Sequence, residues 1–379
     1  MLASNKSWAR NFFSGQQGLE VHPFWHKYDI PGINPAYHYG LGTYIGFVCV
    51  LGTLGNLLVL YLFTVTKSLR SPSNLFILSL ALSDATFSAI NGFPLLTISS
   101  FYRKWIFGKL ACELYSMIGG ICGFASINAV AFIAFDRFFV IAYPFDAMKK
   151  MTKKRAILQI LFLWAYSIAW ALPPMFGWGA FIPEGFQTSC SFDYLTLTLN
   201  NISYVFAMFT FAFILPVLVI IICYINIVRA VSSQAKTMSK TAEKMGAKTT
   251  KDDHKQEIRL AKIAAGTFTL FLLSWSPYAI VTIGGMAGFP WLITPFSCEL
   301  PVMFAKMSAV YNPLLYALSH PKFRAALNDK VPWLTICCPA IETAAKSSRS
   351  GIKSTTAKQS NDSSTAVEME TVVASTVTA

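Results

Sequence analysis

Charged residues are scarce in this sequence. Asp, Glu, Lys and Arg together make up only 13% of the 379 residues, about half the share in a typical soluble protein. Hydrophobic residues make up 54%, and the mean hydropathy is +0.49. Eight cysteines and 22 glycines are too few for a disulfide scaffold or a collagen-like chain. The composition excludes those classes and a disordered chain, and it indicates a protein that folds in a non-aqueous solvent.

Seven apolar stretches are long enough to cross a bilayer as a helix, which takes about 20 residues. They are residues 39–65, 73–99, 114–141, 156–176, 202–228, 263–287 and 295–319. Proline interrupts several of them, and membrane helices tolerate proline because neighbouring helices satisfy the freed backbone groups. We therefore predict an all-α integral membrane protein, a seven-transmembrane helix bundle with a short amphipathic cytoplasmic helix 8 over residues 321–333. No cleavable signal peptide is evident, so the first span is expected to start insertion itself.

Most of the 31 basic residues fall in the loops after the first, third and fifth spans and in the C-terminal tail. By the positive-inside rule the N-terminus is then extracellular and the C-terminus cytoplasmic, in a multi-pass protein of the plasma membrane. The net charge of +13 is thus a topology signal, and we expect no nucleic-acid partner. We predict an extracellular N-terminal segment (1–38), a transmembrane domain with helix 8 (39–333) and a disordered cytoplasmic tail (334–379).

Lys306 is the one Lys or Arg in the interior of any of the seven spans, since Arg137 lies near the end of the third span. At ~1.5 Å per residue it lies near the middle of the bilayer, where a cationic lysine costs at least ~2.5 kcal/mol. Such a residue is either paired with a buried carboxylate for structure or has a functional role. Burial favours the neutral, nucleophilic amine, which suits a Schiff base with an aldehyde.

Motifs along the chain are those of one receptor family. The principal ones are Asp136-Arg137 at the end of the third span, Asn312-Pro313-Leu314-Leu315-Tyr316 after Lys306, and His320-Pro321-Lys322-Phe323-Arg324. The sequence resembles rhodopsin-type G-protein-coupled receptors, specifically opsins, and most closely the rhabdomeric, Gq-coupled visual opsins of molluscs and other invertebrates. The resemblance covers roughly residues 20–338 and includes NGFPL (91–95), KWIFG (104–108), FGWG (176–179), SCSFDY (189–194), LSWSPY (273–278) and FAK (304–306).

The resemblance implies that 11-cis-retinal or a close variant is bound covalently to Lys306. A protonated Schiff base in a low-dielectric pocket requires a counterion. Vertebrate visual opsins carry a carboxylate at the position of Tyr115, three residues after Cys112, so Glu184 is the candidate here. A disulfide between Cys112 and Cys190, expected in the oxidising extracellular compartment, would fold the loop over the bundle and bring Glu184 to the Schiff base. Without the resemblance, a solvated loop acid is the preferred interpretation of Glu184.

Family position places further residues around the chromophore. We expect polar neighbours of the Schiff base at Asn91 and Tyr115, and small, apolar or aromatic residues along the polyene at Gly119, Gly120, Gly123, Met208, Phe209, Phe213, Phe271, Trp275 and Tyr278. Ordinary interhelical hydrogen bonding is the alternative interpretation of Asn91 and Tyr115. Ordinary packing is the alternative for the apolar and aromatic residues, and only their convergence on Lys306 favours a ligand site. Photoisomerisation against Trp275 would open the cytoplasmic end of the sixth helix about Pro277.

A second group of motif residues is expected to couple the receptor to a G protein. Its members are Asp136, Arg137, Glu257, Asn312, Pro313 and Tyr316. Asp136 and Arg137 should pair in the inactive state, and Phe138 replaces the family's usual Tyr. Asn56 and Asp84 are expected in a polar cluster, where Asp84 is either part of a water- or ion-holding site or a protonated structural acid.

Peripheral signals concern modification and partners. Asn5 begins an extracellular glycosylation sequon. Cys337 and Cys338 follow helix 8 and suggest palmitoylation, with free thiols as the alternative. The Ser/Thr-rich tail offers phosphorylation sites for a receptor kinase and a binding segment for arrestin. A flexible tail without these roles is the equally good alternative interpretation.

The predicted function is that of a light-activated G-protein-coupled receptor, a visual-type photoreceptor that activates a Gq-type G protein and phospholipase C from a photoreceptor membrane. We predict no enzymatic activity and no metal site. The alternatives are a retinal photoisomerase and a non-visual opsin with other G-protein coupling. A light-driven pump needs a relay of intramembrane carboxylates, of which only Asp84 stands out, and a receptor for a peptide or amine leaves Lys306 unexplained.

Overall fold

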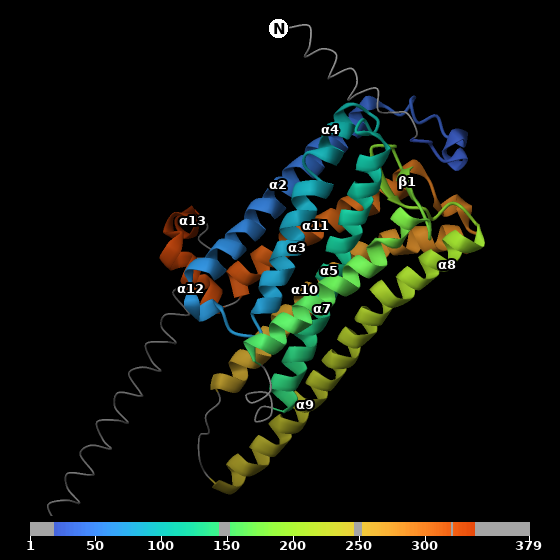
Figure 1. The fold of residues 1–379 in the computed structure, drawn as a ribbon. Coiled ribbons are helices and arrows are strands. Elements are labelled where there is room, and N and C mark those ends of the chain that lie inside the picture. The colour runs from blue at the N-terminus through green and yellow to red at the C-terminus, as the bar shows by residue number, and fades with distance from the viewer. Residues whose placement is uncertain (1–18, 144–151, 246–251, 320, 338–379) are drawn as a thin grey trace, which may run out of the picture. The chain divides into compact units, whose positions relative to one another are not determined.

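The structure, a computed structural model, describes residues 19–143, 152–245, 252–319 and 321–337. Two compact units, Met1–Leu314 and Leu315–Ala379, make up the chain. The first unit holds the helical bundle of Figure 1, and the second holds the short helices near the C-terminus.

Helices occupy all seven predicted spans. Their bounds are α2 (Pro35–Val65), α3 (Leu75–Asn91) with α4 (Leu95–Phe101), α5 (Gly108–Ala142), α7 (Lys153–Ala171), α8 (Leu199–Met208) with α9 (Leu215–Met245), α10 (Asp252–Met286) and α11 (Pro295–Ser319). A π-helical turn, η4 (Phe209–Ile214), joins α8 to α9. Within the described residues, five stretches are long and apolar enough to cross a membrane: Pro35–Val65, Leu75–Phe101, Gly108–Ala142, Leu199–Gln234 and Ala261–Met286. The other two predicted spans are filled by α7 and α11.

Prolines explain where the helices depart from the predicted ranges. The second span is two helices, because α3 ends at Asn91 and α4 begins after Pro94, whose ring nitrogen cannot donate a hydrogen bond. The fourth span is shorter than predicted, since α7 ends at Ala171 and a 3-10 segment, η3 (Pro173–Phe176), follows. The early end of α3 leaves the Asn91 carbonyl without an intrahelical partner, so this oxygen is free to accept from side chains.

The central helix of the bundle is α5. It packs against α3, α7, α9 and α10, and Figure 1 shows it running between them. Small side chains let these helices approach closely. Ala125 of α5 and Ala156 of α7 are buried in one cluster with Phe76 and Leu163. Because of this position, α5 can present side chains to most of the bundle interior.

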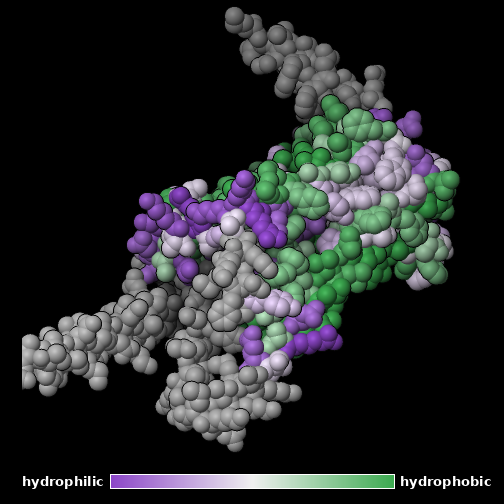
Figure 2. Space-filling view, turned by 60° about the horizontal axis from the view of Figure 1, so that its bottom comes forward, coloured by the Kyte–Doolittle hydropathy of each residue, from purple (hydrophilic) through white to green (hydrophobic). Residues whose placement is uncertain are grey.

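The outward surface of the bundle is apolar. Leu161 and Phe162 of α7 expose their side chains, as do Leu218, Ile222 and Val228 of α9. Figure 2 shows a broad surface of hydrophobic side chains on the face it presents. An exposed apolar surface of this extent marks a membrane or protein contact, and on helices of spanning length it fits the hydrocarbon of a bilayer.

A two-stranded antiparallel hairpin lies between α7 and α8, where the sequence analysis expected only a loop. Strand β1 (Phe181–Glu184) pairs with β2 (Ser189–Phe192), and Pro183 lies opposite Cys190. The residues after the hairpin pack with the N-terminal 3-10 segment η1 (Pro23–Lys27), where Trp25 and Tyr194 are buried in one cluster. The hairpin is therefore part of a packed layer.

The second unit contains α12 (Pro321–Lys330) and α13 (Pro332–Cys337). Phe323, Ala326 and Leu327 are buried, whereas Lys322 and Asp329 are exposed. This spacing is that of an amphipathic helix. The predicted helix 8 is therefore present in this unit, although its predicted range of 321–333 is divided between two helices.

Candidate functional site

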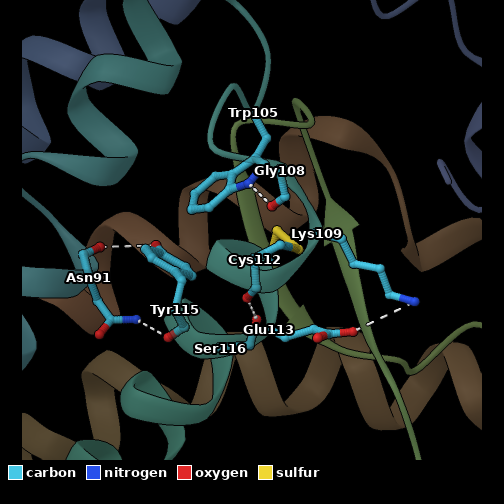
Figure 3. The surroundings of a disulfide bond; sticks show 9 residues. Asn91, Trp105, Gly108, Lys109, Cys112, Glu113, Tyr115 and Ser116 are labelled. Carbon is cyan, nitrogen blue, oxygen red and sulfur yellow. Dashed lines mark hydrogen bonds and ion pairs between the residues drawn. A yellow bond between two sulfur atoms is a disulfide. The ribbon is translucent and has the colours of Figure 1, made fainter. Parts of the chain in front are cut away.

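A disulfide bond ties the hairpin to the central helix. Cys112 of α5 and Cys190 of β2 form the predicted bond, with their Cα atoms 5.5 Å apart. Figure 3 shows its surroundings, where the Trp105 indole donates a hydrogen bond to the Gly108 carbonyl at 2.9 Å. Since β1 pairs with β2, the covalent link fixes both strands against α5.

The turn of the hairpin places Glu184 at the end of β1. The Gln187 amide donates to the Glu184 carbonyl at 2.8 Å, which closes a four-residue turn. Gly185 in this turn has a φ of +54°, a region that favours glycine. The Trp105 amide donates to the Gln187 carbonyl at 2.6 Å and holds the turn from the segment before α5. Glu184 is only 3% exposed, so it is not a solvated loop acid.

Lys306 lies in α11 and is 4% exposed. Its Nζ atom donates hydrogen bonds to the Asn91 carbonyl at 2.5 Å and to the Tyr115 hydroxyl at 3.2 Å. The same atom lies 4.9 Å from the centre of the Phe87 ring. No carboxylate of the described residues lies within 4.0 Å of this amine. Neutral oxygens and an aromatic face therefore hold the amine, without the direct ion pair of a structural lysine.

Asn91 and Tyr115 hold each other across the interface of α3 and α5 (Figure 3). The Asn91 side-chain amide donates to the Tyr115 carbonyl at 2.7 Å, and the Tyr115 hydroxyl donates to the Asn91 carbonyl at 2.9 Å. Gly119 makes room for this pair, because a Cβ atom there would lie 2.5 Å from the Asn91 side-chain nitrogen. The pair presents two oxygens to Lys306, so the two predicted polar neighbours are in contact with the amine.

Hydroxyl groups surround the Glu184 carboxyl. Its Oε2 atom accepts hydrogen bonds from the hydroxyls of Tyr194 at 3.1 Å and Tyr278 at 3.0 Å. Burial raises the pKa of Glu184 to about 7, while the hydrogen bonds from Tyr278 and Tyr194 and the positive charge of Lys306 act in the opposite direction. A carboxyl with this pKa changes its charge near neutral pH, so a permanent cation nearby would favour the carboxylate.

A cavity lies between these groups. Its volume is about 150 Å³, measured as the space open to the centre of a water molecule. Aromatic and aliphatic side chains form most of its walls, and Lys306 and Glu184 are the charged residues among them. The structure brings to this cavity every residue that the family resemblance placed around a chromophore: Asn91, Tyr115, Gly119, Gly120, Gly123, Met208, Phe209, Phe213, Phe271, Trp275 and Tyr278. It adds wall residues that the sequence analysis did not place around the chromophore, including Phe87, Ser191, Phe192 and Tyr204.

Trp275 forms a wall of the cavity on α10. Its ring stacks on Phe271 with centroids 5.7 Å apart, and its indole nitrogen donates to Ser308 of α11 at 3.3 Å. Gly123 leaves room for the ring, because a Cβ atom there would lie 3.3 Å from it. Pro277 follows within α10, and a proline in a helix interior removes one backbone hydrogen bond. Trp275 therefore stands beside the point where α10 can bend.

Asp84 is the centre of a separate polar cluster. The Asn312 side-chain amide donates to it at 2.6 Å, and the Ser126 hydroxyl donates at 2.7 Å. Asn56 has a different hydrogen-bond partner: its side-chain amide donates to the Ala309 carbonyl at 2.8 Å. These bonds connect α2, α3 and α5 to α11.

The motif residues of the predicted switch are described only in part. Arg137 forms an ion pair with Asp136, whose other oxygen accepts from the Ser73 hydroxyl at 3.0 Å. Pro313 is buried inside α11. The other predicted residues lie outside the described residues or have side chains that do: Asn5, Glu257, Tyr316, Cys337 and Cys338.

A buried carboxyl that the sequence analysis overlooked lies in α11. Glu299 is 3% exposed, and its Oε1 atom accepts a hydrogen bond from the Phe186 amide at 3.0 Å. The expectation that only Asp84 stands out as an acid of the spans was therefore wrong. The overlooked signal was the spacing of seven residues to Lys306, which places both side chains on one helix face. No group of three or more His, Cys, Asp or Glu within the described residues could hold a metal ion.

Known proteins resemble the chain over most of its length. The family described as "7 transmembrane receptor (rhodopsin family)" matches residues 55–316. A rhodopsin of Enteroctopus dofleini is 49% identical over 84% of this chain and 70% of its own. A "Rhodopsin, GQ-coupled" of Mizuhopecten yessoensis is 46% identical over 90% of this chain and 68% of its own. The crystal structure of squid rhodopsin matches with a TM-score of 0.78 and 45% identity, over 86% of this chain and 95% of the squid chain.

The described residues thus combine a helical bundle, a buried lysine in the wall of a mostly apolar cavity and a hairpin linked to the bundle by a disulfide. The chain belongs to the rhodopsin family of seven-transmembrane receptors. Its relatives are signalling receptors and not enzymes. The predictions of a multi-pass membrane receptor and of opsin-like character are thereby confirmed.

Proposed function

We propose that the protein is a light-activated receptor that binds retinal covalently at Lys306 and activates a Gq-type heterotrimeric G protein. The observation that carries this proposal is the place of the Lys306 amine, in the wall of a cavity that is otherwise mostly apolar. A lysine amine in such surroundings can capture an aldehyde as a Schiff base. The similarity to a rhodopsin named as Gq-coupled supports the choice of G protein.

The cavity residues suit a ligand with one reactive end and a long apolar body. Lys306, Asn91 and Tyr115 gather polar atoms at one place, whereas Phe209, Phe271 and other aromatic residues form the remaining walls. A few convergent polar groups in an apolar cavity are typical of sites for small ligands. This chemistry matches 11-cis-retinal or a close variant.

Glu184 is the proposed counterion. It is the carboxylate among the described cavity residues, and it is buried with hydroxyl partners that stabilise its charged form. The Lys306 amine donates to the neutral oxygens of Asn91 and Tyr115 and not to a carboxylate of the described residues. Glu184 would therefore compensate the positive charge by electrostatic attraction across the cavity, without a direct hydrogen bond. In a low-dielectric site this attraction favours ionisation of both groups.

Bound retinal supplies light absorption and a change of shape. The protein's part is to convert this change into movement of α10, and Trp275 beside Pro277 is placed to do so. We expect the Asp136–Arg137 ion pair to restrain the inactive state and to open when α10 moves. Light would then shift the population of two receptor states.

The proposal extends to the cellular setting. We expect the N-terminus outside and the C-terminus inside the plasma membrane of a photoreceptor cell, with glycosylation at Asn5 and palmitoylation at Cys337 and Cys338. Phospholipase C would act downstream, and a receptor kinase and arrestin would end the signal at the tail. The positive-inside distribution of basic residues supports this orientation.

The absorption spectrum tests the ligand proposal. Purified wild-type protein mixed with 11-cis-retinal should acquire a visible or near-ultraviolet band that changes on illumination, and Lys306→Ala should show none. Lys306→Arg is the matched control for charge, because a guanidinium stays protonated and cannot form the bond. A wild-type protein that takes up no retinal, or a Lys306→Arg variant that forms the band, would contradict the proposal.

Nucleotide exchange tests the signalling proposal. Illuminated receptor should accelerate nucleotide exchange on a Gq-type G protein, and the same receptor in the dark should not. A pigment that isomerises retinal without accelerating exchange on any G protein would be a photoisomerase, and exchange on another G-protein class would contradict the Gq assignment.

A further inference from the structure

Glu299 contacts the hairpin that carries the proposed counterion. Its Oε1 atom accepts the Phe186 amide at 3.0 Å, and Phe186 lies two residues after Glu184 in the same turn. A Cβ atom on Gly185, between them, would lie 2.7 Å from that oxygen. The Glu299 carboxyl is therefore packed directly on the turn and holds it by a hydrogen bond.

Several contacts hold the hairpin to its surroundings, among them the hydrogen bonds of Tyr278 of α10 with Glu184 and Ser191, and Glu299 supplies one with a distinct role. The disulfide at Cys190 and the Trp105 contact at Gln187 tie the hairpin to α5 and to the segment before it. The Glu299 contact ties it to α11, the helix that carries Lys306. The Glu299 contact is a side-chain hydrogen bond that joins the hairpin of the carboxylate directly to the helix of the amine.

The Phe186 side chain adds packing at the same point. Its ring lies 4.9 Å from the His38 ring of α2 and 5.1 Å from the Phe296 ring of α11, measured between centroids. The ring is thus held between the two helices while its amide is bonded to Glu299. Displacing the turn requires breaking both contacts, so the turn has one preferred position.

The free-energy cost of burying the Glu299 carboxyl indicates that its hydrogen bond with the Phe186 amide has a role beyond packing. A buried carboxyl is expensive unless it is well partnered, and the Oε2 atom of Glu299 is buried with no hydrogen-bond partner among the described residues. Helical spacing places Glu299 two turns before Lys306 on the same face. An apolar residue there would satisfy packing at lower cost, so packing alone does not account for an acid.

We propose that Glu299 is a positioning residue for the counterion: it anchors the hairpin turn to α11 and thereby fixes Glu184 relative to Lys306. This inference rests on the proposed function, since a counterion has a role only beside a charged chromophore linkage. The anchoring atom is an acceptor oxygen, so the account requires an acceptor at position 299 and no negative charge.

The test compares Glu299→Leu with Glu299→Gln. Leucine removes the acceptor, so the retinal-bound pigment should convert from its visible to its near-ultraviolet form at a pH lower by about one unit, as expected when a counter-charge is less well placed. Glutamine keeps an acceptor oxygen for the Phe186 amide and should titrate like the wild type. Glu113→Leu is the control, because the Glu113 carboxylate pairs with Lys109 within α5.

A second readout needs no chromophore. Hydrogen exchange of the segment 181–192 in the ligand-free receptor should be faster in Glu299→Leu than in the wild type, and unchanged in Glu299→Gln. If the wild type binds no retinal, the proposed function fails, while this exchange experiment still decides whether Glu299 anchors the turn.

Gly185→Ala tests the same contact from the hairpin side. A methyl group there collides with the Glu299 oxygen and strains the backbone at a φ of +54°, so Gly185→Ala should displace the turn and lower the pH midpoint as Glu299→Leu does. This variant also serves if Glu299→Leu fails to fold. A wild-type midpoint in Glu299→Leu, or a Glu299→Gln variant that behaves like Glu299→Leu, would overturn the proposal.

Discussion

Two ionisable side chains, Lys306 and Asp84, are buried in the same helical bundle and are satisfied in different ways. Asp84 accepts direct hydrogen bonds of 2.6 and 2.7 Å from Asn312 and Ser126, and both partners lie on neighbouring helices. The Lys306 amine donates hydrogen bonds to two neutral oxygens, those of the Asn91 carbonyl and the Tyr115 hydroxyl. Its proposed counterion, Glu184, lies in a hairpin outside the helices. The Asp84 cluster therefore depends on helix packing, and the Lys306 site depends also on how the hairpin is held.

Among the changes considered, removal of the disulfide should have the largest effect on stability. It should disturb the Lys306 site, which depends on the hairpin, more than the Asp84 cluster, which does not. Cys190→Ser should lower the free energy of unfolding by about 2–5 kcal/mol and release the hairpin from α5. Thermal unfolding of the detergent-purified receptor measures the change. Cys223→Ser is the matched control, because Cys223 is a buried free cysteine of α9. A Cys190→Ser variant as stable as the wild type would show that the hairpin is held without the bond.

Glu184 should contribute to the pH dependence of stability. Its pKa in the folded protein is about 7, above the ordinary value of 4.5, so the folded state keeps a proton that the unfolded chain loses. Stability of the ligand-free receptor should therefore fall as the pH rises from 4.5 to about 7. Glu184→Gln should make this fall smaller, measured as the unfolding temperature against pH, and Glu113→Gln should leave it at the wild-type size. The same slope in Glu184→Gln and in the wild type would contradict the assignment.

Two glycines of α5 should differ in their tolerance of a methyl group. Gly119→Ala places a Cβ atom 2.5 Å from the Asn91 side chain, whereas Gly123→Ala places one 3.3 Å from Trp275. Gly119→Ala should therefore break the Asn91–Tyr115 pair at a cost of about 2 kcal/mol and shift the absorption band. Gly123→Ala should cost less. Spectra and unfolding temperatures of the two variants test the order, and the reverse order would contradict the geometry.

Asp84→Asn should have the smallest effect. Asparagine keeps one oxygen acceptor but loses one of the two hydrogen bonds, which costs about 1 kcal/mol. The pH midpoint of the visible band should stay at the wild-type value, because Asp84 is satisfied within its own cluster. A shifted midpoint would mean that the two sites share charge and that the comparison between them is wrong.

The helices were predictable because membrane spans need long apolar runs, and Lys306 stood out because the interiors of those runs otherwise contain no Lys or Arg. The pairing of Cys112 with Cys190 and the cavity set came from the family resemblance. The hairpin strands were missed because each has only four residues, too few for an alternating pattern. The acceptor role of Asn91 depends on where α3 ends, which the continuous apolar run 73–99 concealed.

Glu299 shows a different limit. Its identity and its spacing to Lys306 were visible in the sequence, but its partner is the amide of Phe186, a backbone group that every residue except proline carries. Side-chain patterns do not identify such a partner. Its assignment needed the three-dimensional position of the hairpin turn.

The most direct test of the central claim is chemical identification of the retinal attachment site. Retinal-bound receptor reduced with borohydride and digested should yield one retinyl-modified peptide, with the added mass on Lys306. Absence of the modification, or its presence on a lysine outside α11, would contradict the account.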